Sequence, residues 1–64
     1  MKVNGKEFEL KVEKTLDKFL DELTINKDKV VIELNGVIVT KEDFAKIVLK
    51  NSNVMEVISF VGGG

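Results

Sequence analysis

The stretch from residue 54 to residue 61 constrains the fold more than any other part of the sequence. It combines aliphatic, Met and Phe side chains with one charge, Glu56, and contains no Gly or Pro. Because strand side chains alternate between two faces, Glu56 indicates that residues 54, 56, 58 and 60 lie nearer water and that residues 55, 57, 59 and 61 point the other way. A strand this apolar on both faces is typical of the middle of a sheet.

Three glycines, Gly62, Gly63 and Gly64, follow this strand. Glycine lacks a Cβ, so such a segment can pass through a space too narrow for a side chain, and it reaches roughly 10 Å when extended. One interpretation is a disordered tail without a role. The other is that the terminal carboxylate is presented on a bare stalk to another protein's active site. We expect a domain over residues 1–61 and a flexible glycine tail over residues 62–64.

Composition excludes several classes of protein. The 64 residues predict one domain, and with no Cys or His it has no disulfide, thiol nucleophile or His/Cys metal site, so its core must rest on packing. Ten Lys balance eleven acidic residues, and Arg, Tyr and Trp are absent, which argues against nucleic-acid binding. The sequence has no apolar run of membrane-spanning length and no signal-peptide core, so we expect a cytoplasmic protein that does not enter a membrane.

Two hairpins are predicted around Asn-Gly turns. Residues 1–12 form the first around Asn4-Gly5, with Phe8 and Val12 on the core face of its second strand. Residues 30–39 form the second around Asn35-Gly36. A short helical turn at residues 40–43 leads into a partly buried connection with four apolar residues: Phe44, Ile47, Val48 and Leu49.

A helix is predicted over residues 15–23, with Thr15 as its N-cap and Asp17 in its first turn. Its apolar residues recur at helical spacing, which gives one stripe for the core. One helix covers only one face of a sheet, so the element order predicts an α+β roll with the last strand between the first strand and residues 30–34. The predicted core is Phe8, Leu10, Leu16, Phe19, Leu20, Leu23, Ile32, Leu34, Met55 and Val57.

With this order of elements the chain resembles a β-grasp, ubiquitin-like protein, with a mixed sheet of four to five strands and one main helix. Three stretches resemble the ThiS sulfur carriers of thiamin biosynthesis: residues 4–6, residues 30–36 and residues 58–64. The resemblance covers essentially the whole chain. A single Asn-Gly turn is a weak signal, whereas an apolar strand running into Gly-Gly after this order of elements is a strong one.

The resemblance implies a carrier rather than an enzyme. In that family a ThiF-like enzyme uses ATP to adenylate the terminal glycine carboxylate, a sulfur donor protein converts it to a thiocarboxylate, and thiazole synthase takes the sulfur. The residue carried over as reactive is Gly64, with Gly63 as spacer and Gly62 as part of the common ending. The chain has no nucleotide-binding motif, so activation must come from outside, and no cofactor is expected to be bound.

Alternation also predicts a partner-docking face on the uncovered side of the sheet. Glu56 directs Ile58 and Phe60 outward, and neighbouring strands add Val31, Glu33 and Ile38. The alternative is that Ile58 and Phe60 are buried under the connection at residues 40–53.

Two other functions remain open at this stage. One is a MoaD-type sulfur carrier for molybdopterin or another sulfur-containing product, and the other is an interaction module whose glycines have no role. A small enzyme is remote, because the usual catalytic residue types are missing.

Overall fold

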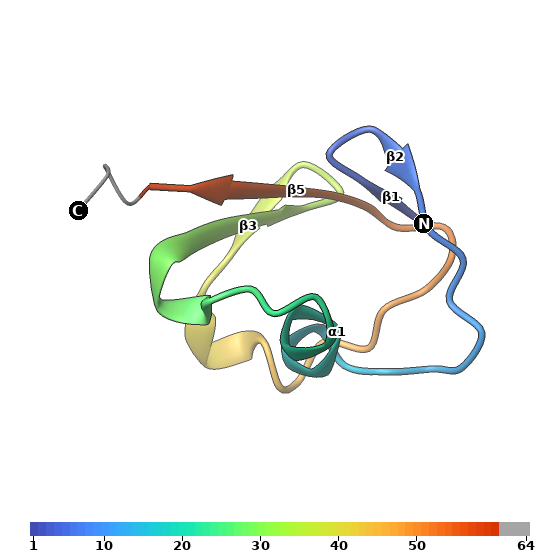
Figure 1. Cartoon of the computed structure of the whole chain (residues 1–64), viewed down its shortest axis with the longest axis horizontal. Helices are drawn as coiled ribbons and strands as arrows, with labels where there is room; N and C mark the ends of the chain where they lie inside the picture. The colour runs from blue at the N-terminus through green and yellow to red at the C-terminus, as the bar shows by residue number, and fades with distance from the viewer. Residues whose placement is uncertain (61–64) are drawn as a thin grey trace.

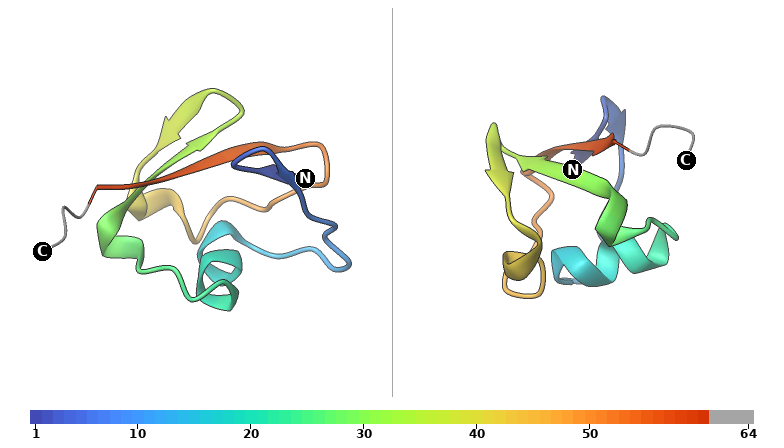
Figure 2. Two further views of the ribbon diagram at one scale, coloured as in Figure 1. Left: turned by 45° about the horizontal axis from the view of Figure 1, so that its top comes forward. Right: turned by 90° about the vertical axis from the view of Figure 1, so that its left-hand side faces the viewer.

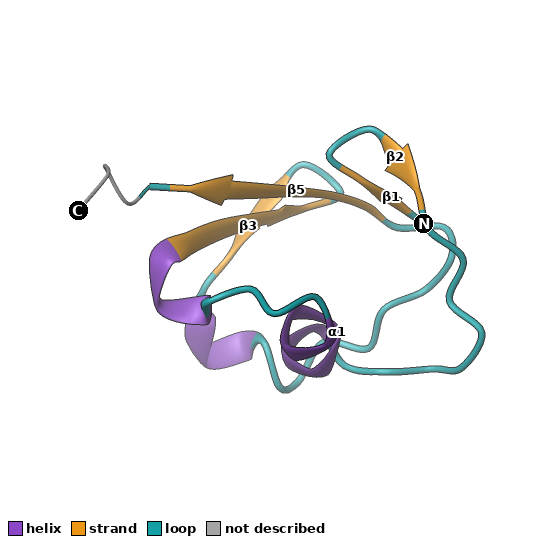
Figure 3. Cartoon of the chain, viewed as in Figure 1, coloured by secondary structure: helices purple, strands orange, loops and turns teal. Residues whose placement is uncertain are grey.

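A computed structural model describes residues 1–60, which form a mixed sheet of five strands with one α-helix packed across one face (Figure 1, Figure 3). The strands are ordered β2-β1-β5-β3-β4. Their bounds are Lys2–Val3 (β1), Lys6–Glu7 (β2), Val30–Leu34 (β3), Val37–Val39 (β4) and Val54–Ser59 (β5). The helix α1 spans Leu16–Glu22, and two 3-10 turns, η1 and η2, span Lys27–Lys29 and Lys41–Asp43.

The central position of β5 is confirmed. It pairs in parallel with β1, where Lys2 lies opposite Val54, and antiparallel with β3 over residues 55–59. Among the strands of residues 1–60, β5 alone therefore links the two hairpins within the sheet. This is the α+β, ubiquitin-like β-grasp architecture that the sequence predicted.

Both Asn-Gly turns adopt the conformation that joins tightly paired strands. Asn4 and Gly5 have φ angles of 51° and 83°, and Asn35 and Gly36 have φ angles of 52° and 84°. Two successive residues with positive φ are what a type I′ turn requires, and Asn and Gly tolerate this region best. Both predicted hairpins are confirmed, and β5 is inserted between them.

The two turn asparagines also hold β5 from either side. The Asn35 Oδ1 accepts a hydrogen bond from the Val54 N–H at 2.9 Å, and the Asn4 Oδ1 accepts one from the Val57 N–H at 2.7 Å. Each asparagine thus shapes its own hairpin and binds the backbone of the strand between the hairpins.

The predicted second strand is shorter than expected. The alternation from Phe8 to Val12 suggested a strand, but β2 ends at Glu7 and Val12 is exposed. Phe8 still pairs with Met1, because the Phe8 N–H donates to the Met1 carbonyl at 2.7 Å. Beyond Phe8 the chain leaves this pairing, and the Asn51 side chain satisfies the backbone of Leu10 instead of a neighbouring strand. The Leu10 N–H donates to Asn51 Oδ1 at 2.8 Å, and the Asn51 Nδ2 donates to the Leu10 carbonyl at 3.1 Å.

Helix α1 packs its predicted apolar stripe against the sheet, except at the C-terminal end. Leu16, Phe19 and Leu20 are buried, and the Phe19 ring meets Phe8 edge-on at a centroid distance of 6.0 Å. The prediction that Leu23 lies in the core is wrong, because it is 36% exposed. Leu23 is the C-cap residue, where the backbone leaves the helical path before its side chain reaches the sheet.

The connection at residues 40–53 contributes more to the core than predicted. Phe44 and Leu49 are buried, and Ile47 is partly buried as expected. The prediction that Val48 is partly buried is wrong, because its side chain is exposed. The connection passes beside the start of α1, where the Leu16 N–H donates to the Ile47 carbonyl at 2.9 Å. It thereby satisfies one of the helix N–H groups that have no partner within the helix.

The core combines residues from every layer of the fold. Four members were absent from the predicted core: Met1, Val3, Phe44 and Leu49. Of the predicted members, Leu16, Phe19, Leu20, Ile32 and Met55 are buried, and Phe8, Leu10, Leu34 and Val57 are partly buried against them.

Replacing Leu20 by Ala should lower the free energy of unfolding by about 2–5 kcal/mol, because Leu20 is 0% exposed and its removal leaves a cavity. Leu23→Ala, on the same helix, is the matched control and should cost well under half as much. Chemical denaturation of both variants checks this. Equal losses would show that the helix end is packed more tightly than described.

Candidate functional site

The face of the sheet opposite α1 carries the outward side chains of β5. Glu56 is exposed, Ile58 is 51% exposed and Phe60, the residue after β5, is 59% exposed. Figure 2 shows the helix and the connection gathered on the other side of the sheet. The predicted alternation is therefore confirmed over residues 54–58, whereas Ser59 is exposed at the end of the strand and residue 61 lies outside the described residues. The alternative that the connection buries Ile58 and Phe60 is wrong.

Strand register brings the other predicted docking residues onto this face. Val31 lies opposite Ile58, and Glu33 lies opposite Glu56. Glu33 is also opposite Ile38 of β4, which is 63% exposed. We call these six residues the docking face: Val31, Glu33, Ile38, Glu56, Ile58 and Phe60. The structure places them together, while their contact with a partner stays a proposal.

The two glutamates give the docking face a pair of neighbouring carboxylates. Glu33 and Glu56 are direct cross-strand neighbours, an arrangement that destabilises a sheet when the charges are alike. Neither belongs to the ion pairs found among residues 1–60. The face thus joins exposed apolar side chains to two carboxylates, which suits a partner surface that is apolar and basic.

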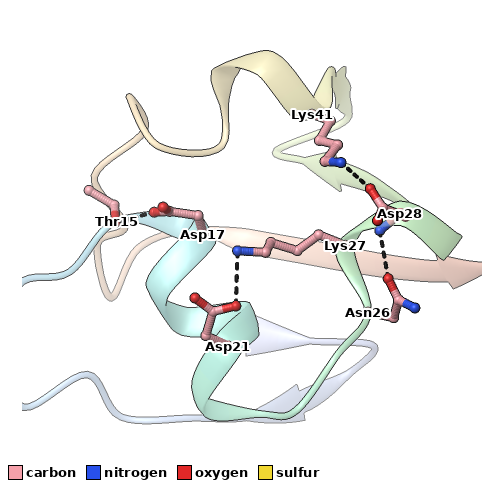
Figure 4. A network of polar contacts seen from close by, with 7 residues as sticks. All are labelled: Thr15, Asp17, Asp21, Asn26, Lys27, Asp28 and Lys41. Carbon is pink, nitrogen blue, oxygen red and sulfur yellow. Dashed lines mark hydrogen bonds and ion pairs between the residues drawn. The ribbon is translucent and has the colours of Figure 1, made fainter.

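A separate polar network lies on the helical side of the molecule (Figure 4). Asn26 caps η1, since its Oδ1 accepts from the Asp28 N–H at 3.0 Å. The Lys41 ammonium at the start of η2 donates to the Asp28 carboxylate and lowers the pKa of that carboxyl. The pair therefore ties the two 3-10 turns together on the face that lies away from the docking residues.

Two further contacts in Figure 4 involve the helix. The Thr15 hydroxyl donates to the Asp17 carboxylate and lowers its pKa, so Thr15 precedes the helix as predicted but does not cap a backbone N–H. Lys27 approaches Asp21 at 2.9 Å, and this hydrogen-bonded partner raises the pKa of the Lys27 ammonium. These contacts order the helix surface and have no evident chemical task.

The described part of the chain offers no other candidate centre. Within residues 1–60 no group of His, Cys, Asp and Glu is arranged to hold a metal ion. No helix in this range has the length and apolarity needed to cross a membrane. The predicted reactive residue Gly64 and its neighbours Gly62 and Gly63 lie outside the described residues.

The five-stranded mixed sheet with one helix across one face defines a ubiquitin-like β-grasp protein. The sequence profile of the ThiS family matches residues 1–64, so the chain belongs to the ThiS family. The crystal structure of the thiamine biosynthesis protein ThiS from Geobacter metallireducens superposes with a TM-score of 0.82 at 29% identity, covering 98% of this chain and 96% of that one.

Two sequence relatives add to this comparison. A thiazole synthase of Paramagnetospirillum magneticum is 32% identical over 62 residues, which are 97% of this chain but 19% of that protein. The ycf40 protein of Trieres chinensis is 31% identical over 62 residues, which are 97% of this chain and 85% of that protein. The chain therefore spans about a fifth of the first relative and most of the second.

Acidification should destabilise the protein in part through Asp28. Its pKa is lower in the folded state than in the unfolded state, so its stabilising contribution is complete above the unfolded pKa and is lost as pH falls through the folded pKa. We expect Asp28→Asn to lose less stability than the parent chain between neutral pH and about pH 3.

The measurement is the denaturant midpoint at the two pH values. Glu42→Gln is the control, because Glu42 is exposed and belongs to none of the ion pairs among residues 1–60. It should lose as much stability as the parent chain. An unchanged acid response in Asp28→Asn would show that the Lys41 contact does not persist in solution.

Proposed function

We propose that this protein is a sulfur carrier whose Gly64 carboxylate is adenylated by a ThiF-like enzyme and converted to a thiocarboxylate for thiazole formation. The observation that carries the proposal is the match of the ThiS family over residues 1–64, which includes the terminal glycines. The similarity to a protein described as a thiazole synthase and to a thiamine biosynthesis protein supports the placement in thiamin biosynthesis.

The chemistry divides the work between carrier and partners. A carboxylate is a poor electrophile until one of its oxygens becomes part of a leaving group. Attack of the Gly64 carboxylate on the α-phosphorus of ATP would release pyrophosphate and form the acyl-adenylate. A donor carrying sulfur at the sulfide level would then displace AMP at the acyl carbon, so that sulfur replaces one carboxylate oxygen. The carrier supplies only the acyl group and a surface that the enzymes recognise.

The docking face is a candidate surface for recognition by the adenylating enzyme. Strand β5 ends at Ser59, close in sequence to the proposed reactive segment. Of the six docking-face residues, Ile58 and Phe60 are therefore the nearest in sequence to that segment. Exposed apolar side chains on one face indicate a binding surface rather than a requirement of folding. The Glu33 and Glu56 carboxylates would favour a partner with basic side chains and speed its approach at low salt.

The direct test is ATP–pyrophosphate exchange with a purified ThiF-like enzyme. Exchange that depends on this protein would support adenylation. Mass spectrometry after a sulfur donor is added should then show a species heavier by the difference between a sulfur and an oxygen atom. No exchange with any such enzyme would refute the carrier function.

Adding one Ala after Gly64 should abolish pyrophosphate exchange without changing the unfolding transition, because the reacting carboxylate would be moved out of position. Enzymatic removal of the added residue is the control and should restore exchange. Normal exchange by the extended chain would contradict the assignment of Gly64.

Replacing Phe60 by Ala should separate stability from binding. Because the side chain is 59% exposed, the free energy of unfolding should change by no more than about 0.5 kcal/mol. Binding to the adenylating enzyme should weaken by about 1–2 kcal/mol, as for an aromatic anchor that enters a pocket.

Calorimetry and denaturation of the same preparation give both values. Val12→Ala is the control, since Val12 is an exposed apolar residue outside the docking face. If Phe60→Ala bound as tightly as Val12→Ala, the anchor would have to lie elsewhere.

A further inference from the structure

Strand β5 has two edges, and its backbone groups alternate between them. The Phe60 N–H donates to the Lys29 carbonyl at 3.2 Å, on the β3 side. The Met55 carbonyl accepts from the Asn4 N–H at 2.9 Å, on the β1 side. Because successive residues of a strand point their backbone groups to opposite edges, even-numbered residues of β5 pair toward β3 and odd-numbered residues toward β1.

The β1 side of β5 is occupied only along its first part. β1 ends at Val3, and the side chain of Asn4 takes the next position. Its Oδ1 accepts from the Val57 N–H at 2.7 Å, and its Nδ2 lies 3.4 Å from the Val57 carbonyl, to which it donates. The carboxamide thus offers one acceptor and one donor, as a peptide group of a neighbouring strand would.

Ser59 is the next odd-numbered residue, and its edge is open. Figure 1 shows β5 continuing past β1 and β2 while β3 still runs beside it. Within residues 1–60 no group accepts from the Ser59 N–H or donates to its carbonyl, and the residue is exposed. This edge position has no charged side chain or Pro, the features with which proteins commonly protect a sheet edge.

We propose that the open edge at Ser59 is a strand-addition site, where an extended main-chain segment of the adenylating enzyme pairs with β5. The proposal rests on the carrier function given above. The segment would take up the position that follows Asn4 along the edge, with a carbonyl receiving the Ser59 N–H and an N–H donating to the Ser59 carbonyl. Pairing of this kind supplies affinity through main-chain hydrogen bonds.

The residues near the Ser59 edge indicate which kind of protein would pair with it. Ser59 lies between Ile58 and Phe60 in β5 and its extension, so a segment of a partner that covers the docking face also adjoins this edge. A second copy of this chain would instead add more carboxylates to a face that already has Glu33 opposite Glu56. A basic partner is favoured over self-association for that reason.

Ser59→Pro tests the proposal because it removes the N–H from the open edge alone. Proline is tolerated in a strand where its missing N–H faces outward. We expect Ser59→Pro to fold, with binding to the ThiF-like enzyme weakened about five- to tenfold, the value of one or two net hydrogen bonds. Ser59→Ala keeps the N–H and should bind as the parent chain does. Ile58→Pro removes an N–H on the β3 side and should lose stability instead.

A chemically synthesised chain with N-methyl Ser59 gives a second measurement, which avoids the fixed φ of proline. Weakened binding by this folded chain, with Ser59→Ala unaffected, would support strand addition. Binding equal to that of the parent chain would overturn it, as would association of the parent chain into dimers that Ser59→Pro abolishes. If the parent chain itself neither binds nor supports exchange, the carrier function fails instead.

Discussion

The pairing of β5 with both β1 and β3 holds the sheet together. Neither hairpin would be stable alone, since a two-stranded ribbon is marginal in water. Between them, β5 supplies hydrogen bonds to both sides and buries Met55 against the helix layer. Asn4 and Asn35 strengthen this arrangement, because each turn residue also binds the backbone of the central strand.

Sequence patterns predicted the parts of the fold that depend on local chemistry. The two Asn-Gly turns, the helix at Leu16–Glu22 and the alternation of β5 all follow from residue preferences within short segments. The strand expected to continue through Val12 was not found. The backbone of Leu10 pairs instead with the side chain of Asn51, which lies far away in sequence. The prediction that Leu23 lies in the core was wrong for a related reason. Helical spacing places Leu23 on the apolar stripe but does not say where the sheet ends.

The docking face was predictable because side chains alternate along a strand. If the charged Glu56 side chain faces water, the sides of its neighbours along the strand follow. Its composition across strands was less certain, since strand register is a property of the folded sheet. The opposition of Glu33 and Glu56 appears only in that register. The open edge at Ser59 could not be read from sequence at all, because it depends on where β1 ends relative to β5.

The central strand is also the last element of the described chain, and this has a consequence for how the protein is made. A ribosome releases both hairpins and the helix before β5, yet the sheet cannot close until β5 arrives to join β1 across more than 50 intervening residues. Folding therefore depends on contacts of high sequence separation and must wait until β5 has been synthesised. In a chain cut short before β5, neither hairpin would have the strand that joins it to the rest of the sheet, so both would be marginal and open to proteases. Only chains with the strand that leads toward the glycines can reach the folded state.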